Sequence, residues 1–536
     1  MVLSQVEQQL KEKIEWSLQN FMITNAIFLA ERLVNEPSCS AEDKEFKLSL
    51  LARAYFAENS PHKVEAVLKS STSEQNGYLY AFACFQTAKL EEGERALMRH
   101  LHSLGAHGYY LLGQICERQA RIQDAINYYS KALNQNPSLW SAYEKLCKLG
   151  FFVDPATAFK SQAMKENPVG MYSPSENLGF PLSSANIEKS PSPSRSPKGQ
   201  RGFQDLQAML TELGKAFLAY SQYSIEEALQ HFKGLPDSQR NSAWSLCQQA
   251  KCYVEKYNYS TAIDLFQRAF QTEPQRVQDS DYYSSALWYE KRGTELCYTL
   301  HSALKTAYYA PQTWVIAGNF FSLQKERETA IKCFTRAIQL NPYYSYAYSL
   351  CGHEHLANED FEQARYHYES ATKIDPRQFT ALWGLGSMYF KQERFTQSLK
   401  YYKDARQINP VSGIILTYLG VNYKTIGHHE EAINCFEEAI RLDKNNPLPR
   451  FQLGILLSQL DRDQDALSHL ETLCQENPRE SHLYIQIGKI HAKLGDAQKA
   501  MKFYNDAQDL NPKNQTEVKN LIEQLHGSSS FPIVPY

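Results

Sequence analysis

The chain has 536 residues, 43% of them hydrophobic and 21% charged, and its formal net charge is -3. This nearly neutral balance gives no global reason to expect binding to nucleic acid or to an anionic membrane. The chain is also longer than one compact core usually supports, which favours several domains or a solenoid.

Eleven cysteines are scattered singly along the chain, and the closest pair, Cys247 and Cys252, has four residues between its members. Because no CxxC pair occurs, we interpret them as buried, reduced cysteines of an intracellular protein. The opening residues lack the apolar run of a signal peptide, and no apolar stretch of about 18 residues is present. We therefore expect a soluble protein with no membrane-spanning helix.

The N-terminal part predicts helical hairpins over residues 1–105, followed by one clear repeat over 106–139. That repeat is marked by small and aromatic residues at helical spacing and by a closing proline: Leu112, Gly113, Ala125, Tyr129, Ala132 and Pro137. We expect an N-terminal array that ends at about residue 158.

The pattern disappears over residues 159–204, where the sequence SPSPSRSPKGQRG is rich in Ser, Pro and Gly. Such a segment buries too little apolar surface to offset its conformational entropy, so we predict a disordered insert. Four serines in it precede proline and are candidates for phosphorylation by proline-directed kinases: Ser173, Ser190, Ser192 and Ser196. Ser-Pro pairs also simply decorate disordered linkers, and the sequence leaves both interpretations open for each serine.

The repeat pattern returns weakly in 209–242 and more clearly in 243–276. Residues 277–310 keep the length of one repeat but lack its Gly and Ala marks, which predicts a helical hairpin with altered packing. Six glycines then follow at intervals of 34 residues: Gly318, Gly352, Gly386, Gly420, Gly454 and Gly488. This period is that of the tetratricopeptide (TPR) repeat.

The spacing has a physical reason. Two antiparallel helices approach closely only where side chains are small, so Gly at repeat position 8 and Ala at position 20 mark their crossing, and large residues at helical spacing fill the space around it. A proline at position 32, as in Asn341-Pro342, stops the second helix. The predicted fold is therefore all-α, a TPR superhelical solenoid in two arrays separated by the disordered insert.

We divide the chain into an N-terminal array at 1–158, the insert at 159–204, a C-terminal superhelix at 205–514 and a tail at 515–536. The most metal-like cluster is His353-Glu354-His355. On a helix the two histidines point about 200 degrees apart, so they do not share one ion easily. No metalloprotease, P-loop, nucleophile-elbow or dinucleotide-binding signature occurs, and we predict no metal, no cofactor and no catalytic residue.

Five segments resemble the cell-division-cycle twenty-seven family of the anaphase-promoting complex. They are residues 26–33 (AIFLAERL), 281–288 (DYYSSALW), 314–324 (WVIAGNFFSLQ), 347–354 (AYSLCGHE) and 389–393 (YFKQE). The order of a short array, an insert with Ser-Pro sites and a long array is similar as well. The insert here is shorter than in many members of the family.

The resemblance implies a non-catalytic scaffold in a multisubunit ubiquitin ligase that acts on cell-cycle proteins, located in nucleus and cytoplasm. It also implies a homodimer formed through the N-terminal array, contacts with other TPR subunits, and a C-terminal groove that captures the Ile-Arg tails of coactivators and of a processivity subunit. Within the same class, the chain could instead be another TPR subunit or a co-chaperone adaptor, although Lys391, Lys424 and Lys489 make a poor clamp for an acidic tail. A fused catalytic domain would need about a hundred more residues.

In the repeats most similar to the family, the positions expected to face the groove give a candidate peptide-binding set. We expect Asn319 and Lys391 to serve the carboxylate of a tail, Glu354 its guanidinium group and Trp383 its apolar side chain. The whole set is Asn319, Ser322, Ser349, His353, Glu354, Trp383, Ser387 and Lys391.

Overall fold

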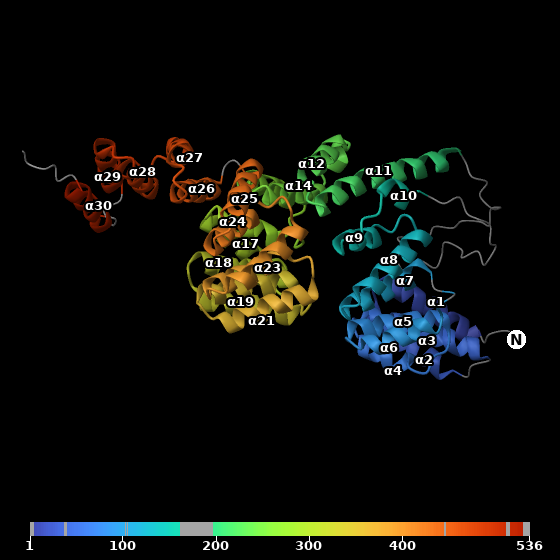
Figure 1. Cartoon of the computed structure of the whole chain (residues 1–536). Helices are drawn as coiled ribbons and strands as arrows, with labels where there is room; N and C mark the ends of the chain where they lie inside the picture. The colour runs from blue at the N-terminus through green and yellow to red at the C-terminus, as the bar shows by residue number, and fades with distance from the viewer. Residues whose placement is uncertain are drawn as a thin grey trace, which may run out of the picture. The chain divides into compact units, whose positions relative to one another are not determined.

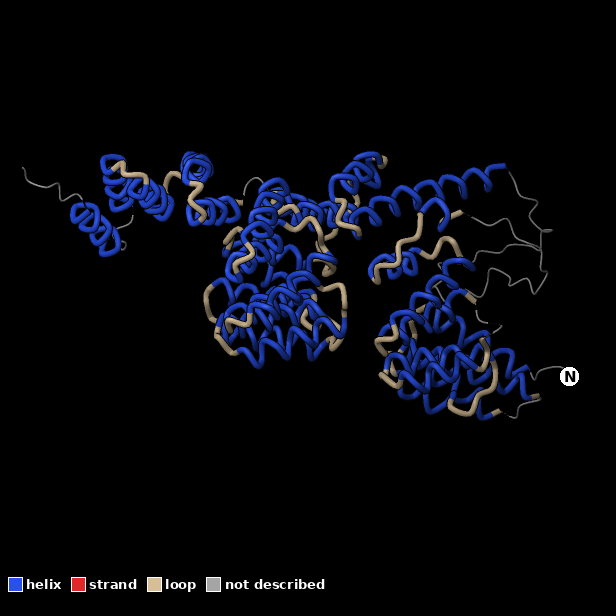
Figure 2. The backbone as a smooth tube through the Cα atoms, in the orientation of Figure 1, coloured by secondary structure: helices blue, strands red, loops and turns tan. Residues whose placement is uncertain are grey.

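A computed structural model describes residues 5–36, 40–101, 103, 105–160, 197–443, 446–510 and 515–528. In these residues all regular structure is helical (Figure 2). The chain divides into two compact units, residues 1–245 and 246–536, which we describe separately. The predicted all-α solenoid is confirmed.

The first unit consists of short antiparallel helices in pairs, drawn in blue to green in Figure 1. Its helices are α1 (Gln5–Gln19), α2 (Ile23–Asn35), α3 (Ala41–Ala57), α4 (Pro61–Leu68), α5 (Glu74–Gln86), α6 (Leu90–Met98), α7 (Ala106–Arg118), α8 (Ile122–Gln135), α9 (Trp140–Lys148), α10 (Pro155–Ala158), α11 (Pro197–Ser221), α12 (Ile225–Gly234) and α13 (Asp237–Arg240).

The second unit begins within α14 (Ala243–Glu255) and continues the alternation of two helices per repeat. Its further helices are α15 (Tyr259–Thr272), α16 (Ser280–Tyr289), α17 (Gly293–Thr306), α18 (Pro311–Leu323), α19 (Arg327–Leu340), α20 (Ser345–Ala357), α21 (Phe361–Ile374), α22 (Phe379–Lys391), α23 (Phe395–Ile408), α24 (Gly413–Ile426), α25 (His429–Leu442), α26 (Pro447–Gln459), α27 (Asp463–Glu476), α28 (Ser481–Lys493), α29 (Ala497–Leu510) and α30 (Gln515–Ser528).

The periodic glycines lie where the two helices of each repeat cross, as the sequence predicts. A Cβ atom added at Gly386 on α22 would lie 2.6 Å from two ring atoms of Tyr402 on α23. Tyr402 is fully buried, so its ring has little room to move. The same pairing of glycine with a large residue recurs down the array, and the alanines of position 20 are buried beside it. Close approach at this point therefore sets the geometry of each hairpin.

A second 34-residue period appears only in the structure. The turn between the two helices of each repeat contains one residue with positive φ, at Lys291, Lys325, Glu359, Glu393, Gly427, Asp461 and Gly495. Most of these residues are not glycine, although the left-handed conformation costs a non-glycine residue about 1 kcal/mol. The hairpin geometry therefore imposes this conformation on the turn whatever residue occupies it.

Several second helices end just before an Asn-Pro or Asp-Pro pair, as predicted: α8, α19, α21, α23, α27 and α29. α19 ends at Leu340, and the side chain of Asn341 then accepts a hydrogen bond from the amide of Tyr343 at 3.1 Å. Asp375 does the same for the amide of Arg377 at 3.0 Å after α21. These Asx turns satisfy a backbone amide of the connecting turn and direct the chain into the next repeat.

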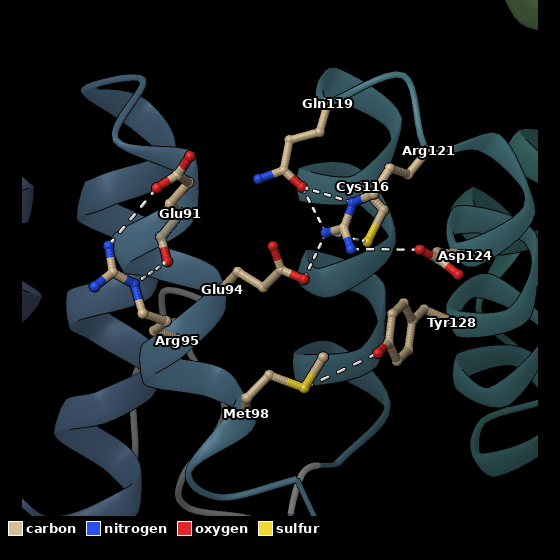
Figure 3. A network of polar contacts seen from close by, with 9 residues as sticks. All are labelled: Glu91, Glu94, Arg95, Met98, Cys116, Gln119, Arg121, Asp124 and Tyr128. Atoms are coloured by element: carbon tan, nitrogen blue, oxygen red, sulfur yellow. Dashed lines mark hydrogen bonds and ion pairs between the residues drawn. The ribbon is translucent and has the colours of Figure 1, made fainter.

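A polar network joins three helices of the first unit (Figure 3). The guanidinium group of Arg121, the residue that precedes α8, contacts the carboxylates of Glu94 on α6 and Asp124 on α8. It also donates to Gln119 and contacts the sulfur of Cys116 at 3.3 Å on α7. One cation therefore ties neighbouring repeats together at a partly exposed edge.

The last helices of the first unit come from both sides of the predicted insert and contact one another. The hydroxyl of Tyr143 on α9 donates to the carbonyl of Gly214 on α11 at 3.2 Å, and Phe159 is buried beside Tyr143. α11 begins at Pro197, within the range 159–204 that we assigned to the insert. Proline suits a first helical position, because its missing N–H has no partner there in any helix.

The remainder of the insert, residues 161–196, lies outside the described residues. The phosphorylation candidates Ser173, Ser190, Ser192 and Ser196 lie there too, and their use stays a prediction. The atypical unit at 277–310 is a helical hairpin, α16 and α17, as expected. The predicted domain boundaries themselves stay a prediction.

Candidate functional site

The eight candidate groove residues lie on the first helices of three consecutive repeats. α18 carries two of them, and α20 and α22 carry three each. α18 packs against α16, α20 packs against α22, and a hydrogen bond from Ser322 to Glu354 joins α18 to α20. These first helices therefore lie side by side as one layer. In a TPR array this layer lines the concave side.

Asn319 on α18 is only 4% exposed and its amide nitrogen is fully engaged. It donates to the hydroxyls of Ser284 at 2.8 Å and Ser285 at 3.2 Å, both on α16. Those two hydroxyls in turn donate to the carbonyl of Asp281. Asn319 thus joins two repeats through a buried polar chain.

This chain continues to the next repeat through an aromatic pair. The hydroxyls of Ser285 and Tyr346 are 2.7 Å apart, and the ring of Tyr346 stacks on Tyr282 with centroids 5.7 Å apart. The first helices of three repeats, α16, α18 and α20, are therefore linked by side chains from residues that the sequence places far apart.

Ser322 and Glu354 form the second group. The hydroxyl of Ser322 donates to Glu354 at 2.5 Å and accepts from the indole N–H of Trp288 at 3.2 Å. Burial raises the pKa of the Glu354 carboxyl above its usual value, while the bond from Ser322 acts in the opposite direction. The site therefore holds a half-buried carboxylate that gains from a cationic neighbour.

His353 and Trp383 form the third group. The hydroxyl of Tyr368 lies 2.7 Å from Nδ1 of His353, and burial lowers the pKa of His353 to about 4. Its ring packs edge-on against Trp383, which packs in the same way against Tyr418. The buried indole N–H of Trp383 has no hydrogen-bond acceptor within the described residues. An unpaired buried donor costs free energy, so this position favours an incoming acceptor.

The remaining candidates contact the scaffold itself. Ser349 is buried and bonds to the carbonyl of Ser345, and Ser387 lies 3.1 Å from the hydroxyl of Tyr402. The ammonium of Lys391 donates to the carbonyl of Leu356, the last turn of α20, at 3.3 Å. The structure thus brings together Ser322 with Glu354 and His353 with Trp383, whereas Lys391 lies at the end of a helix.

Sequence reasoning missed a charged cluster beside these residues. Lys251 on α14 pairs with Asp279, lies over the ring of Tyr282 at 4.6 Å, and shares Asp279 with Arg276. Burial acts to raise the pKa of Asp279, but the two cations hold it below its usual value. The departure of residues 277–310 from the repeat pattern was the signal that pointed here.

The neighbouring Asp281 has a different environment. Its carboxylate accepts a hydrogen bond from Tyr344 at 2.5 Å, and burial raises its pKa. The interior of this unit therefore offers two half-satisfied carboxylates, Asp281 and Glu354, among tyrosine hydroxyls. Such a surface suits a cationic side chain with an apolar stem.

His353 and His355 face different neighbours, as the helical twist predicts. His355 stacks on His367 at 5.2 Å and contacts Asp360, away from Tyr368 and Trp383. Across the described residues, no group of three His, Cys, Asp or Glu side chains has the arrangement of a metal site. No helix in the described part of the chain combines the length and apolar character that a membrane span requires.

Comparison with known proteins shows what the repeats and the N-terminal segment are similar to. A family model for anaphase-promoting complex, cyclosome, subunit 3 matches residues 19–100. TPR models match 106–139, 311–344, 352–393, 377–445 and 481–514. Anaphase-promoting complex subunit 3 of Schizosaccharomyces pombe is 38% identical over 181 residues, which is 34% of this chain and 27% of that protein. The chain is therefore similar to subunit 3 proteins over part of its length.

Other subunit 3 relatives cover more of the chain. Cell division cycle protein 27 homolog A of Arabidopsis thaliana is 26% identical over 547 residues, spanning 67% of this chain and 76% of the plant protein. The match to the fission-yeast protein spans only about a quarter of its length. Among solved structures, the crystal structure of the APC/C hetero-tetramer Cut9-Hcn1 is similar with a TM-score of 0.69, 14% identity and coverage of 98% of this chain and 96% of that one. This likeness supports the TPR solenoid fold.

Proposed function

We propose that the chain is a non-catalytic TPR scaffold subunit of the anaphase-promoting complex that supports ubiquitination of cell-cycle proteins. The subunit 3 relatives and the matching N-terminal family model support this assignment. The observation that carries its binding role is the interior of the second unit, where half-buried carboxylates lie beside unpaired or stacked aromatic side chains.

We assign the concave face to peptide tails that end in Ile-Arg, as in coactivators and a processivity subunit. Glu354 is our acceptor for the guanidinium group, because its half-buried carboxylate forms no ion pair within the described part of the chain. Trp383 and Tyr418 supply the apolar surface for Ile. The amide nitrogen of Asn319 already donates to the hydroxyl oxygens of Ser284 and Ser285. A bound carboxylate would therefore share the N–H donors of Asn319 with those two oxygens.

The competing co-chaperone role needs several free cations at the groove. Each lysine that could build such a clamp has a partner. Lys391 donates to Leu356, Lys424 donates to Gln452 at 2.7 Å, and Lys489 pairs with Glu517 at 3.1 Å. This arrangement favours the Ile-Arg tail over an acidic tail.

Fluorescence anisotropy with a labelled peptide ending in Ile-Arg tests the assignment. We expect Glu354→Gln to weaken binding about tenfold or more, because it removes a charge-assisted hydrogen bond. Trp383→Ala should weaken it by a similar factor through lost apolar contact. The exposed Glu471→Gln on α27 serves as the matched control and should bind as the wild type does.

Two further peptides make the test specific. A peptide with an amidated C-terminus and one ending in Ile-Ala should both bind weakly. If Glu354→Gln and Trp383→Ala both retain wild-type affinity, or if all peptides bind equally, this assignment of the groove is wrong.

We also propose a homodimer formed through the first unit, contacts with other TPR subunits, and a location in nucleus and cytoplasm. Large apolar side chains are exposed on α1, α2, α3 and the turn between α1 and α2: Val6, Trp16, Phe21, Met22, Phe28 and Phe46. Several large exposed apolar side chains on neighbouring helices support a protein interface here. In an assay of ubiquitin transfer, the isolated chain should be inactive without other subunits, and transfer by the pure chain would contradict the scaffold role.

A further inference from the structure

Two side-chain contacts in the second unit join parts of the chain about 155 residues apart. The hydroxyls of Tyr257 and Ser412 are 2.8 Å apart. The amide nitrogen of Asn409 donates to Glu255 at 3.4 Å. We call these four residues the clasp. It connects the turn between α14 and α15 with the turn between α23 and α24.

The clasp closes the chain on itself. Between its two sides the chain passes through α16 to α22, the helices that carry the candidate groove. Consecutive repeats in this stretch contact their neighbours, whereas the clasp joins repeats that are not consecutive. In a solenoid each repeat normally contacts only the repeats next to it in sequence. The clasp joins distant repeats and therefore limits how far one superhelical turn can open.

Both sides of the clasp are held in place by local structure. Asn409 is 2% exposed and follows α23 directly, and Ser412 is buried at the start of α24, where its hydroxyl caps the amide of Ile415. Tyr257 occupies the left-handed position of its turn, with φ of 58°. The polar groups of the clasp are therefore positioned by helix ends and a fixed turn.

The pairing of Glu255 with Asn409 is incomplete. The hydrogen bond is long, at 3.4 Å, and the buried Oδ1 of Asn409 has no partner among the described residues. A carboxylate has no hydrogen to offer this oxygen, whereas a carboxylic acid has one. A protonated Glu255 can accept from the Asn409 amide and donate to its Oδ1, which satisfies both buried atoms.

We propose that the clasp is a proton-operated latch, in which protonation of Glu255 completes a two-bond pair with Asn409 and holds the superhelical turn closed. The carboxylate takes up one proton from solvent, and no covalent bond to the protein forms or breaks. Loss of that proton leaves a charged carboxylate and an unpaired amide oxygen, and this weakens closure.

The direction of the pH effect follows from the environment of Glu255. Burial raises the pKa of its carboxyl to about 7, although the bond from Asn409 opposes this. When the clasp opens into water the pKa returns toward its ordinary value of about 4.3. The closed state therefore binds the proton more tightly, and closure weakens as pH rises from about 4.3 through about 7.

The other titratable groups that interact with Glu255 stay neutral over this range. They come from α14, α15 and α16 and the turn between α14 and α15, and burial raises the pKa of each: Cys252, Tyr257, Tyr259, Tyr282 and Tyr289. From the other side of the clasp, the charge of Asp443, which follows α25, also acts to raise the pKa of Tyr257. The switch near neutral pH thus belongs to Glu255.

Hydrogen exchange on the full chain, corrected for intrinsic rates and compared at pH 5.5 and 7.5, tests the latch. The segments to follow are 253–261 and 409–417, which span the two clasp turns and the adjoining helix ends. We expect their protection to fall about tenfold between the two pH values in the wild type. Glu255→Gln imitates the neutral acid and should keep high protection at both.

Three further variants complete the design. Asn409→Ala removes the two-bond pair and should give lower protection than the wild type at pH 5.5, and Tyr257→Phe should lower protection equally at both pH values. The exposed control Glu471→Gln should behave as the wild type does. The latch is refuted if wild-type protection of these segments is the same at both pH values, if its fall persists in Glu255→Gln, or if Asn409→Ala protects these segments at pH 5.5 as well as the wild type does.

Discussion

At the scale of single residues, the polar atoms of the groove differ in how they are satisfied. Asn319 donates its amide hydrogens to serine hydroxyls on α16, whereas the buried indole N–H of Trp383 has no acceptor within the described residues. His353 is kept neutral by burial and lies within hydrogen-bond distance of Tyr368. Asn319, whose amide hydrogens are used within the protein, stabilises the scaffold, whereas the unpaired indole N–H of Trp383 is available to a ligand.

The depressed pKa of His353 predicts a loss of stability in acid. Its folded pKa is about 4, against about 6.5 when unfolded, so the stability is fully present above about 6.5 and is lost as pH falls toward about 4. Between pH 7 and 5 we expect this residue to cost about 2 kcal/mol. In urea unfolding, His353→Gln should lose about that much less than the wild type. Equal acid losses in both proteins would contradict the assignment.

In the first unit, Lys47 predicts a large effect from one buried charge. Its ammonium is 1% exposed and pairs with Glu7 at 2.7 Å and Asp43 at 3.0 Å. Lys47→Met would leave two carboxylates without their shared cation, so we expect a loss of about 3 kcal/mol or more. Thermal unfolding measures this, with the exposed Lys63→Met as the control that changes little. A Lys47→Met variant as stable as the control would refute this role.

At the scale of elements, the crossing glycines make a sharp prediction. Gly386→Ala would place a methyl group against the buried ring of Tyr402, and we expect a loss of about 1–3 kcal/mol from overpacking. In Gly293→Ala, at the start of α17, the added methyl group would lie 3.6 Å from a side-chain atom of Leu323, so the change should be neutral or slightly stabilising. Chemical denaturation of both variants compares them. Equal stability would show that the crossing tolerates a side chain.

The sequence predicted the hairpins well because their determinants are local. Gly386 and its aromatic partner Tyr402 are 16 residues apart, and a glycine with a large residue at this spacing recurs in all six repeats from Gly318 to Gly488. The left-handed turn residues escaped notice because Lys325 and Glu359 have side chains that do not mark the conformation. The partners of Asn319 escaped as well, since Ser284 and Ser285 belong to the one repeat that departs from the pattern.

The clasp was beyond sequence reasoning for a different reason. Contact between Glu255 and Asn409 depends on the rotation that accumulates over several repeats. A small change in the rotation angle per repeat would separate the two turns, and this angle cannot be predicted from the residue types alone. The candidate groove was predictable only as a set of positions on the first helices. Which of them pair, as Ser322 does with Glu354, required the structure.

At the scale of the whole molecule, the two units have different predicted tasks. The first presents an apolar face and the second an interior rich in carboxylates and aromatic rings. This division fits a scaffold whose one array assembles copies while its other array captures peptide tails.

The apolar face of the first unit predicts dimerisation. Trp16 is 50% exposed and Phe28 is 52% exposed, on α1 and α2. We expect the double variant Trp16→Glu and Phe28→Glu to run as a monomer near 61.5 kDa, and the wild type near twice that mass. Light scattering coupled to gel filtration measures this. Phe151→Glu, an exposed residue outside the face, is the control. A double variant that stays dimeric would place the interface elsewhere.

The most direct test of the central claim is affinity purification of the full chain from dividing cells, with the bound proteins identified by mass spectrometry. We expect the other subunits of the anaphase-promoting complex, and a weaker yield of coactivators with the Glu354→Gln variant than with wild type. Recovery of chaperones in their place, or of no complex subunit at all, would contradict the proposed function.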